Sequence, residues 1–326
     1  MLLAGTEDGV YRAAGPRFDD AEQVLDSDRV MRVRRFDGWD GVFAATKSGL
    51  FRSTDGVSAS EATRGSSDAT SDGGDSWTDL GVPREEVYSV LGDPAGERLY
   101  AGTHPANLYV SEDDGETWQE LRSLQELPSR EEWYTPRHRN EAHVRSLCAH
   151  PDAPDRLVVG VEVGGVHISD DRGETLTERR DGLHDDVHHV LMVGPDEFVA
   201  STGNGLYRTR DAGEHWTRLD DGLDHRYFRA AFAHDGTLYA AAARSSPGTW
   251  SGERGADAAL FESGDGGDNF ESVSYPGAPE EVVLAWAAHD GEVVAGTNDG
   301  GVIVRAGGEW VEAGRMPAGI RSLCAP

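Results

Sequence analysis

Among the residues that could carry acid–base chemistry, Glu162 has the most unusual sequence setting. It lies in the run Val-Glu-Val-Gly-Gly-Val, which is an odd setting for a solvated acid. Glycoside hydrolysis needs two carboxylates at a fixed separation, one of them with a raised pKa. Glu162 is therefore the best candidate for a catalytic acid, with Glu141 or Asp186 as its candidate partner. Nucleophilic catalysis has less support, because the chain contains no Gly-x-Ser-x-Gly elbow.

Histidines, arginines and aromatic residues form a wider set that could bind a ligand. A single such residue is more often solvated or salt-bridged than functional, so the prediction depends on how many of them gather on one face. Imidazole and carboxylate groups also bind metals. In this chain they come from distant segments with no local ligand spacing, so we expect no metal and no cofactor. The candidate ligand-binding residues are His104, Trp133, His143, Arg145, Glu162, His188, Arg226, Tyr227, Trp250 and Arg321.

A repeat runs through the whole chain and must position these residues. Each copy is a β-rich run ending in Ala-Gly-Thr or a variant, then a short turn, then Gly-Leu-Tyr-Arg or a variant. The copies lie at 2–12, 42–52, 99–110, 158–168, 199–208, 238–262 and 293–304. A base period of about 40 residues is typical of four-stranded propeller blades. The sequence therefore predicts an all-β, seven-bladed β-propeller over 1–326, with 318–325 completing the first blade and closing the ring.

A second pattern, Ser/Thr-x-Asp-x-Gly-x-x-aromatic, follows most copies of the repeat. It occurs at 70–77, 111–118, 169–176, 209–216 and 263–270, with Leu176 in place of the aromatic residue in one copy. The Asp can accept hydrogen bonds from N–H groups of its own turn, and the Gly supplies a positive φ. We expect the aromatic residue to fill the gap between blades.

These motifs resemble the Asp-box, or BNR, repeat of β-propellers, and the resemblance covers nearly the whole chain. That superfamily includes sialidases, some glycanases, sortilin-type receptors and photosystem II stability and assembly factors. The chain is most similar to the stand-alone members described only as glycosyl-hydrolase-like. The resemblance implies a fold more than an activity, because the Asp box is structural. We find no Arg-Ile-Pro motif near the N-terminus and no Tyr–Glu nucleophile pair, so sialidase activity is not expected.

Propeller geometry sorts the loops between two faces. The loops between the second and third strands of each blade, and the segments joining one blade to the next, share a side that we call the top face. Insertions at 119–143 and 243–257 fall there, and the first carries Tyr134, Arg137, His138 and Arg139. A third insertion, 54–69, is rich in Ser, Ala and Gly and is expected on the bottom face as a solvated loop.

Composition excludes several classes of partner. The 326 residues include 59 acids and 30 bases, for a net charge of −29, and Lys47 is the only lysine. A nucleic acid or an anionic membrane would be repelled. Such an acid excess suggests a proteome adapted to molar salt. With no signal-peptide pattern, no long apolar run and two cysteines, we expect a cytoplasmic protein and a monomer.

Two functions remain open from the sequence. We favour a non-catalytic scaffold whose top face binds a protein client or a small glycan-like ligand. The alternative is a glycoside hydrolase, sialidase-like or acting on another glycan, that uses Glu162 with a second carboxylate of the top face. A small-molecule site predicts that Glu162 faces an open channel beside His143 or Arg145. A scaffold predicts a Glu162 that is salt-bridged and closed to small molecules.

Overall fold

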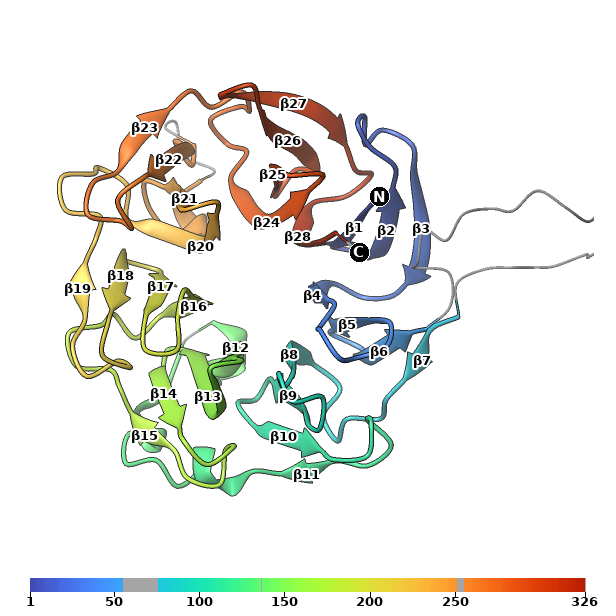
Figure 1. Ribbon diagram of the computed structural model, residues 1–326, viewed down its shortest axis with the longest axis vertical. Coiled ribbons are helices and arrows are strands. Elements are labelled where there is room, and N and C mark those ends of the chain that lie inside the picture. Colours follow the sequence, from blue (N-terminus) through green and yellow to red (C-terminus); the bar gives the residue numbers. More distant parts are fainter. Residues whose placement is uncertain (55–75, 136, 251–254, 326) are drawn as a thin grey trace, which may run out of the picture.

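A computed structural model describes residues 1–54, 76–135, 137–250 and 255–325 of the chain. It shows seven four-stranded antiparallel sheets arranged as blades around a ring (Figure 1). The predicted seven-bladed all-β fold is confirmed. The insertion at 55–69 and most of the 70–77 turn lie outside the described residues.

Each blade runs from an innermost strand near the axis to an outermost strand at the rim (Figure 1). In that order, blade 1 contains β28 (Ile320–Cys324), β1 (Leu2–Thr6), β2 (Gly9–Ala13) and β3 (Ala21–Asp26). Blades 2 and 3 contain β4 (Val30–Arg34), β5 (Val42–Thr46), β6 (Gly49–Ser53) and β7 (Thr78–Asp79), then β8 (Val87–Gly92), β9 (Leu99–Thr103), β10 (Leu108–Ser111) and β11 (Gln119–Glu120). Blades 4 and 5 contain β12 (His143–His150), β13 (Ala153–Glu162), β14 (Gly165–Ser169) and β15 (Thr177–Glu178), then β16 (Val187–Met192), β17 (Phe198–Thr202), β18 (Gly205–Thr209) and β19 (Thr217–Arg218). Blades 6 and 7 contain β20 (Tyr227–His234), β21 (Thr237–Ala243), β22 (Ala259–Ser263) and β23 (Glu271–Val273), then β24 (Val283–His289), β25 (Glu292–Thr297), β26 (Gly301–Ala306) and β27 (Glu309–Arg315).

Short 3-10 helices occur only inside the two top-face insertions of the described chain. They are η1 (Arg122–Leu124), η2 (Arg130–Glu132) and η3 (His138–Asn140) between β11 and β12, and η4 (Pro247–Thr249) between β21 and β22. None of these single turns has the length or apolarity that a membrane-crossing helix requires.

The ring closes through the two ends of the chain. β28 pairs antiparallel with β1, so the last strand is the innermost strand of the first blade (Figure 1). The segment predicted to close the ring does so. Closure leaves β1 paired on both sides, so the inner edge of blade 1 is β28, an innermost strand like those of the other six blades.

The small residue in each Ala-Gly-Thr run marks a close approach between neighbouring blades. A Cβ added at Gly102 of β9 would lie 2.4 Å from Cγ1 of Val144, which belongs to the innermost strand of the next blade. A Cβ at Gly296 of β25 would lie 2.6 Å from Ile320 in the same way. The threonine that follows closes the turn, as when Thr202 Oγ1 donates to the Gly205 carbonyl at 2.8 Å. The repeat therefore encodes both blade spacing and turn geometry.

The innermost strand of every blade carries a β-bulge near its start. In β12, Val144 and Ser146 pair with two consecutive residues of the partner strand. Arg145, which lies between them, is therefore the extra residue of the bulge. The same shift leaves His188 extra in β16. Comparable shifts occur in β4, β8, β20, β24 and β28. A bulge re-aims the side chains around it, so these positions depart from simple alternation.

The Ser/Thr-x-Asp-x-Gly turns that the structure describes share one set of hydrogen bonds. In the 111–118 turn, Asp113 Oδ1 accepts from Ser111 Oγ at 2.8 Å and from the Thr117 amide at 2.8 Å. Trp118 then donates its indole N–H to the Leu80 carbonyl of the preceding blade at 2.8 Å. The turns at 169–176, 209–216 and 263–270 repeat the Asp contacts. Trp216 does the same to the Arg179 carbonyl at 2.8 Å, so these two tryptophans each tie a blade to the one before it.

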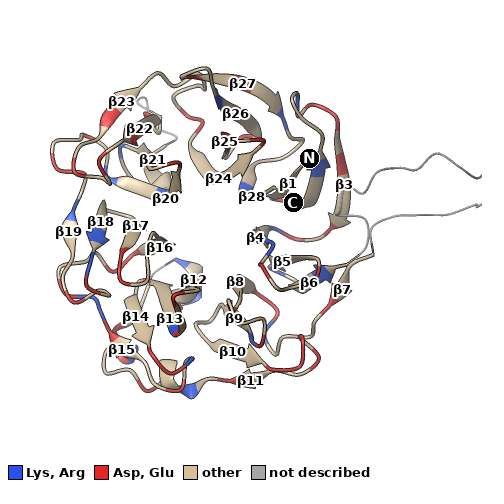
Figure 2. Cartoon of the chain, in the orientation of Figure 1, with Lys and Arg blue, Asp and Glu red and all other residues tan. Residues whose placement is uncertain are grey.

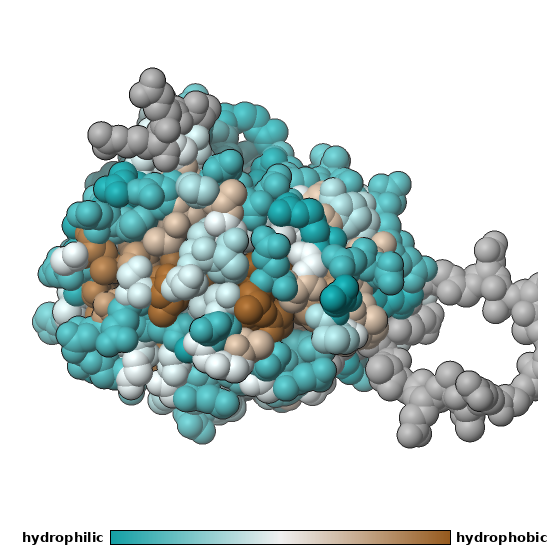
Figure 3. Space-filling model, turned by 90° about the horizontal axis from the view of Figure 1, so that it is seen from above, coloured by the Kyte–Doolittle hydropathy of each residue, from teal (hydrophilic) through white to brown (hydrophobic). Residues whose placement is uncertain are grey.

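The surface charge is unevenly distributed. Acidic residues appear mainly in loops and outer strands, whereas the inner strands β4, β20 and β28 carry arginines (Figure 2). Seen from its edge, the propeller is largely hydrophilic, with small apolar patches along its middle (Figure 3). A few arginines therefore lie near the axis of an acidic protein, whereas others lie on the middle and outer strands (Figure 2).

We expect Gly102→Ala to destabilise the fold by about 1–3 kcal/mol, because the new methyl group would overpack the contact between blades 3 and 4. It would also crowd Ser89 Oγ, which donates to the Val144 carbonyl at 2.8 Å. The measurement is thermal unfolding in molar KCl. The control is Gly264→Ala, where an added Cβ meets nothing within 4 Å. Equal melting temperatures for the two variants would contradict this explanation of the repeat.

Candidate functional site

Glu162 and His143 face each other across two strands of blade 4. Glu162 ends β13, His143 begins β12, and the antiparallel register pairs them directly. His143 Nε2 lies 3.0 Å from Glu162 Oε2. Backbone hydrogen bonds join the loops and blade-connecting segments at this end, as when the Gly203 amide donates to the Asp186 carbonyl at 2.9 Å. These groups therefore lie at the top face.

Two further cationic or imidazole groups surround the Glu162 carboxylate. Arg145, the bulge residue of β12, forms an ion pair with Glu162 Oε2, and its Nη1 lies 3.1 Å from His143 Nε2. His138, from the insertion between β11 and β12, places Nε2 3.5 Å from Glu162 Oε1. The Glu162 residue is only 6% exposed. Its carboxylate is thus enclosed and already partnered on both oxygens.

These partners determine the charge states in the cluster. Burial alone would raise the pKa of Glu162, but the Arg145 charge and the two imidazoles outweigh it and hold that pKa well below the ordinary value. Burial lowers the pKa of His143 to about 4, against the opposing pull of Glu162. At neutral pH the cluster therefore consists of a carboxylate, a guanidinium and a neutral His143.

Asp186 and His188 extend the cluster toward blade 5. The backbones of Glu162 and Asp186 form an isolated antiparallel bridge. His188 Nε2 lies 3.5 Å from Asp186 Oδ1, and His188 Nδ1 donates to the Phe228 carbonyl at 2.6 Å. Burial would raise the pKa of Asp186, but its contact with His188 outweighs that effect and lowers it. The second carboxylate is therefore ionised as well.

A separate network fastens the 119–143 insertion to blade 3. His104 Nδ1 lies 3.1 Å from Glu86 Oε2, and His104 Nε2 donates to the His138 carbonyl at 2.9 Å. Arg139 Nη2 donates to Glu86 Oε1 at 2.5 Å. These contacts fix the backbone that carries His138 above Glu162.

Among the described residues, two groups of side chains could hold a metal ion. They are His138, His143 and Glu162, and then Glu162, Asp186 and His188; within each group the ligand atoms lie within 4.8 Å of one another. The Arg145 guanidinium already touches Glu162 Oε2, so a divalent cation would have to compete with it for the shared ligand. Imidazole and carboxylate ligands suit a borderline metal ion, but the nearby Arg145 charge opposes the binding of a cation.

The remaining predicted residues lie in different places. Trp133 is buried in an apolar cluster with Val161, its ring 5.0 Å from that of His167, so it supports the core rather than facing a ligand. Tyr227 is buried beside His188, with ring centroids 4.8 Å apart, and the half-buried Trp250 packs 5.8 Å from Tyr227.

The contacts described for three other predicted residues do not involve Glu162. Arg226 donates to Asp220 at 2.9 Å in the segment that joins β19 to β20. Arg321 forms an ion pair with Glu7 and lines the central channel. Glu141 is half-buried at the base of the insertion, where its amide donates to the His138 carbonyl at 3.2 Å.

Sequence reasoning did not select Glu86, Arg32, Arg34 or His189. Glu86 immediately precedes β8. A charged residue next to an inner strand is the only signal in the sequence that could have indicated its role. Arg32 and His189 follow the bulge residue of their strands, where strict alternation would place them away from the channel. A search for charged residues on both sides of the bulge position could have found them.

No protein-family model matches the chain, and no curated protein matches it. Solved structures do match. The GH74 xyloglucanase from Xanthomonas campestris aligns over 96% of this chain and 46% of its own, with a TM-score of 0.61 and 16% identity. The extracellular domain of the putative hybrid two component system BT4673 from B. thetaiotaomicron aligns over 98% of this chain and 37% of its own, with a TM-score of 0.61 and 13% identity.

A structure of YCF48 bound to a D1 peptide aligns over 69% of this chain and 66% of its own, with a TM-score of 0.46 and 16% identity, a likeness too low to carry an argument. This chain spans less than half of the xyloglucanase and of the BT4673 domain. At such identities the similarity shows the propeller fold alone.

We expect the ring signals of His143 to stay unshifted between pH 8 and 5, because its pKa lies at about 4. Histidine-selective NMR measures this, with assignment by a His143→Gln variant. The internal control is His215, whose pKa the Asp211 carboxylate raises above 6.5. A His143 midpoint near 6.5 would contradict the enclosed cluster.

Proposed function

We propose that this chain is a non-catalytic scaffold that binds a protein client at its top face. The observation that carries the proposal is the ion pairing of Glu162. Glycoside hydrolysis requires one carboxylic acid that stays protonated near neutrality. In this cluster both carboxylates, Glu162 and Asp186, have lowered pKa values. No proton donor for a leaving group follows from this arrangement.

The geometry of Glu162 supports the same conclusion. Arg145, His143 and His138 occupy both of its oxygens. Removing one partner of a buried ion pair is costly, whereas the intact set rigidifies its surroundings. The cluster is therefore suited to holding the base of the 119–143 insertion against blade 4.

Exposed side chains around this base are suited to a protein partner. Tyr134 is 59% exposed, the side chain of Arg139 is 67% exposed, and Arg137 is also exposed. Arginine and tyrosine are enriched among the residues that dominate binding energy at protein interfaces. In a chain of net charge −29, such a patch favours a client segment that carries carboxylates and an apolar contact.

The alternative is a glycoside hydrolase that pairs Glu162 with Asp186 or Glu141. The oxygens of Glu162 and Asp186 approach within 4.8 Å. That separation is close to the spacing of about 5–5.5 Å in retaining enzymes, but two ionised carboxylates leave the acid role unfilled. Hydrolysis is therefore the outcome that the experiment must distinguish from client binding.

The test combines client capture with a hydrolysis assay in molar KCl. We expect the immobilised wild-type protein to retain a client from lysate of the source organism, and the double variant Tyr134→Ala/Arg137→Glu to retain at least tenfold less. The control is Arg210→Glu in the 209–216 turn, at an exposed site distant from the insertion.

Hydrolysis is measured on xyloglucan and on a panel of glycosides and sialosides, with Glu162→Gln as the reference. We expect the wild-type protein and Glu162→Gln to show the same background rate. Glycan turnover that disappears in Glu162→Gln would favour the hydrolase instead. Capture unaffected by the double variant would also contradict the proposal.

A further inference from the structure

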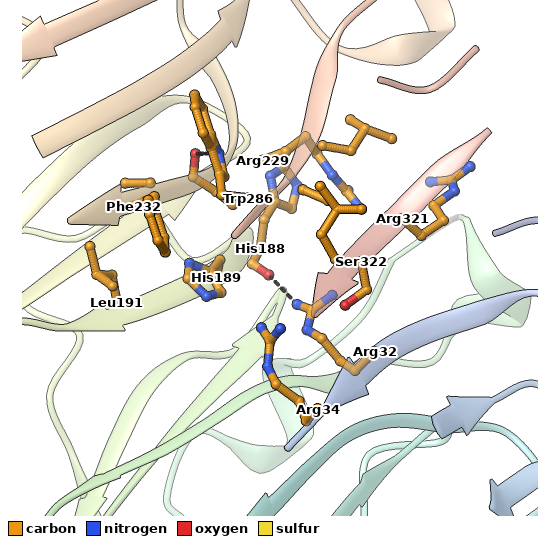
Figure 4. A pocket seen from close by; sticks show the side chains of 15 residues that line it. Arg32, Arg34, His188, His189, Leu191, Arg229, Phe232, Trp286, Arg321 and Ser322 are labelled. Atoms are coloured by element: carbon orange, nitrogen blue, oxygen red, sulfur yellow. Dashed lines mark hydrogen bonds between the residues drawn. The ribbon is translucent and has the colours of Figure 1, made fainter. Parts of the chain in front are cut away.

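The central channel contains a cavity that shares only His188 with the top-face cluster. It encloses about 200 Å³ and is lined by the inner strands β4, β16, β20, β24 and β28 (Figure 4). Its polar lining includes Arg32, Arg34, Arg229, Arg321 and His189, and no aspartate or glutamate is among its lining residues. In a chain with 59 acids and 30 bases, a cavity of this composition is notable.

Three of these arginines, Arg32, Arg34 and Arg229, have no counter-ion in the described part of the chain. Arg32 donates to the carbonyls of Met31 at 2.8 Å and Arg145 at 3.1 Å. Arg34 donates to the Val33 carbonyl at 3.4 Å. Both come from β4 and point toward the side of the cavity that holds His188 and His189 (Figure 4). Carbonyl dipoles satisfy some N–H groups but do not neutralise the charges.

The other lining groups define the rest of the cavity. Arg321 forms an ion pair with Glu7, which also pairs with Arg29, and Arg229 Nη1 donates to Tyr227 Oη at 3.2 Å. His189 Nδ1 is buried and has no hydrogen-bond partner. Phe232 and Trp286 lie on the wall with their rings parallel and 6.5 Å apart. The cavity therefore has a cationic side and an apolar side.

The positive charges of Arg32 and Arg34 repel each other, and the described residues of the protein supply no negative group that offsets this repulsion. Burial and the neighbouring Arg34 and Arg145 charges lower the pKa of Arg32. Burial, together with the nearby Arg32 and Arg34 charges, also lowers the pKa of His189 and holds that side chain neutral. Arg32 and Arg34 are half-buried. Like charges held close together at such a site are costly without a partner, and guanidinium groups form their strongest hydrogen bonds with oxyanions. An anion between Arg32 and Arg34 would offset both the cost of burying these charges and the repulsion between them.

We propose that the channel binds a small doubly charged oxyanion, held by Arg32 and Arg34 with its organic part against Phe232 and Trp286. A volume of about 200 Å³ is smaller than a drug-sized pocket and suits a phosphate monoester or a short dicarboxylate. The shared chemistry is a planar or tetrahedral group of acceptor oxygens that matches the guanidinium fork. This site uses none of the residues on which the protein-client proposal depends.

The experiment measures melting temperature and calorimetric affinity with millimolar phosphate, sulfate or succinate added at constant ionic strength set by KCl. Oxyanions stabilise many proteins by exclusion from the surface, so the result is the difference between wild type and Arg32→Met/Arg34→Met. We expect a saturable rise for the wild type that is lost in the double variant, and affinity at least tenfold weaker in Arg34→Met alone.

The matched control is Arg226→Gln, which removes an arginine that does not line the cavity and should keep the full response. Response to phosphate and sulfate but not succinate assigns a tetrahedral ligand, and response to succinate assigns a carboxylate. An equal response in the double variant, or none in the wild type, overturns the proposal. If the double variant fails to fold, anomalous scattering from selenate soaked into wild-type crystals decides it: density between Arg32 and Arg34 supports the site, and its absence there overturns it.

Discussion

The close approach of neighbouring blades around the axis is the constraint on which the rest of this structure depends. The second strand of a blade must carry a very small residue where the innermost strand of the next blade packs on it. Gly5, Gly102, Gly160 and Gly296 occupy that position, and an added Cβ at any of them would meet a valine or isoleucine of the following blade. Alanine or serine fills it in the remaining blades, at positions 45, 201 and 241. The Ala-Gly-Thr repeat is therefore a spacing rule for the ring.

Convergence at the axis also explains why charged residues meet there. Seven inner strands each place a bulge near the top of the channel, so the side chains around seven bulges share a narrow space. Where a carboxylate ends the adjacent strand, as Glu162 does beside Arg145, the charges neutralise each other. Where none does, as at Arg32 and Arg34, positive charge remains in the cavity. The acidic residues that dominate the composition lie mainly in the periphery, where water and salt screen them.

The fold was predictable because every blade repeats the same local signals. The site was predictable only in part. The pairing of His143 with Glu162 follows from the blade pattern, since the start of an innermost strand always faces the end of its neighbour. The roles of Arg32 and His189 did not follow, because a bulge breaks the period of two with which side chains alternate along a strand. Trp133 lies in an irregular insertion, where no periodic pattern distinguishes a buried aromatic residue from an exposed one.

The charge state of Glu162 is the most direct test of a non-catalytic top face, because it separates a structural ion pair from a catalytic acid. Carbon-13 NMR of glutamate carboxyl groups, assigned by comparison with Glu162→Gln, gives its titration curve in the folded protein. We expect a signal that stays in its ionised position from pH 7 down past the ordinary glutamate pKa of 4.5, because Arg145 and the imidazoles favour the charged form. A midpoint above that value would mean that burial outweighs the ion pair. Glu162 would then be a proton donor, which would contradict the non-catalytic scaffold.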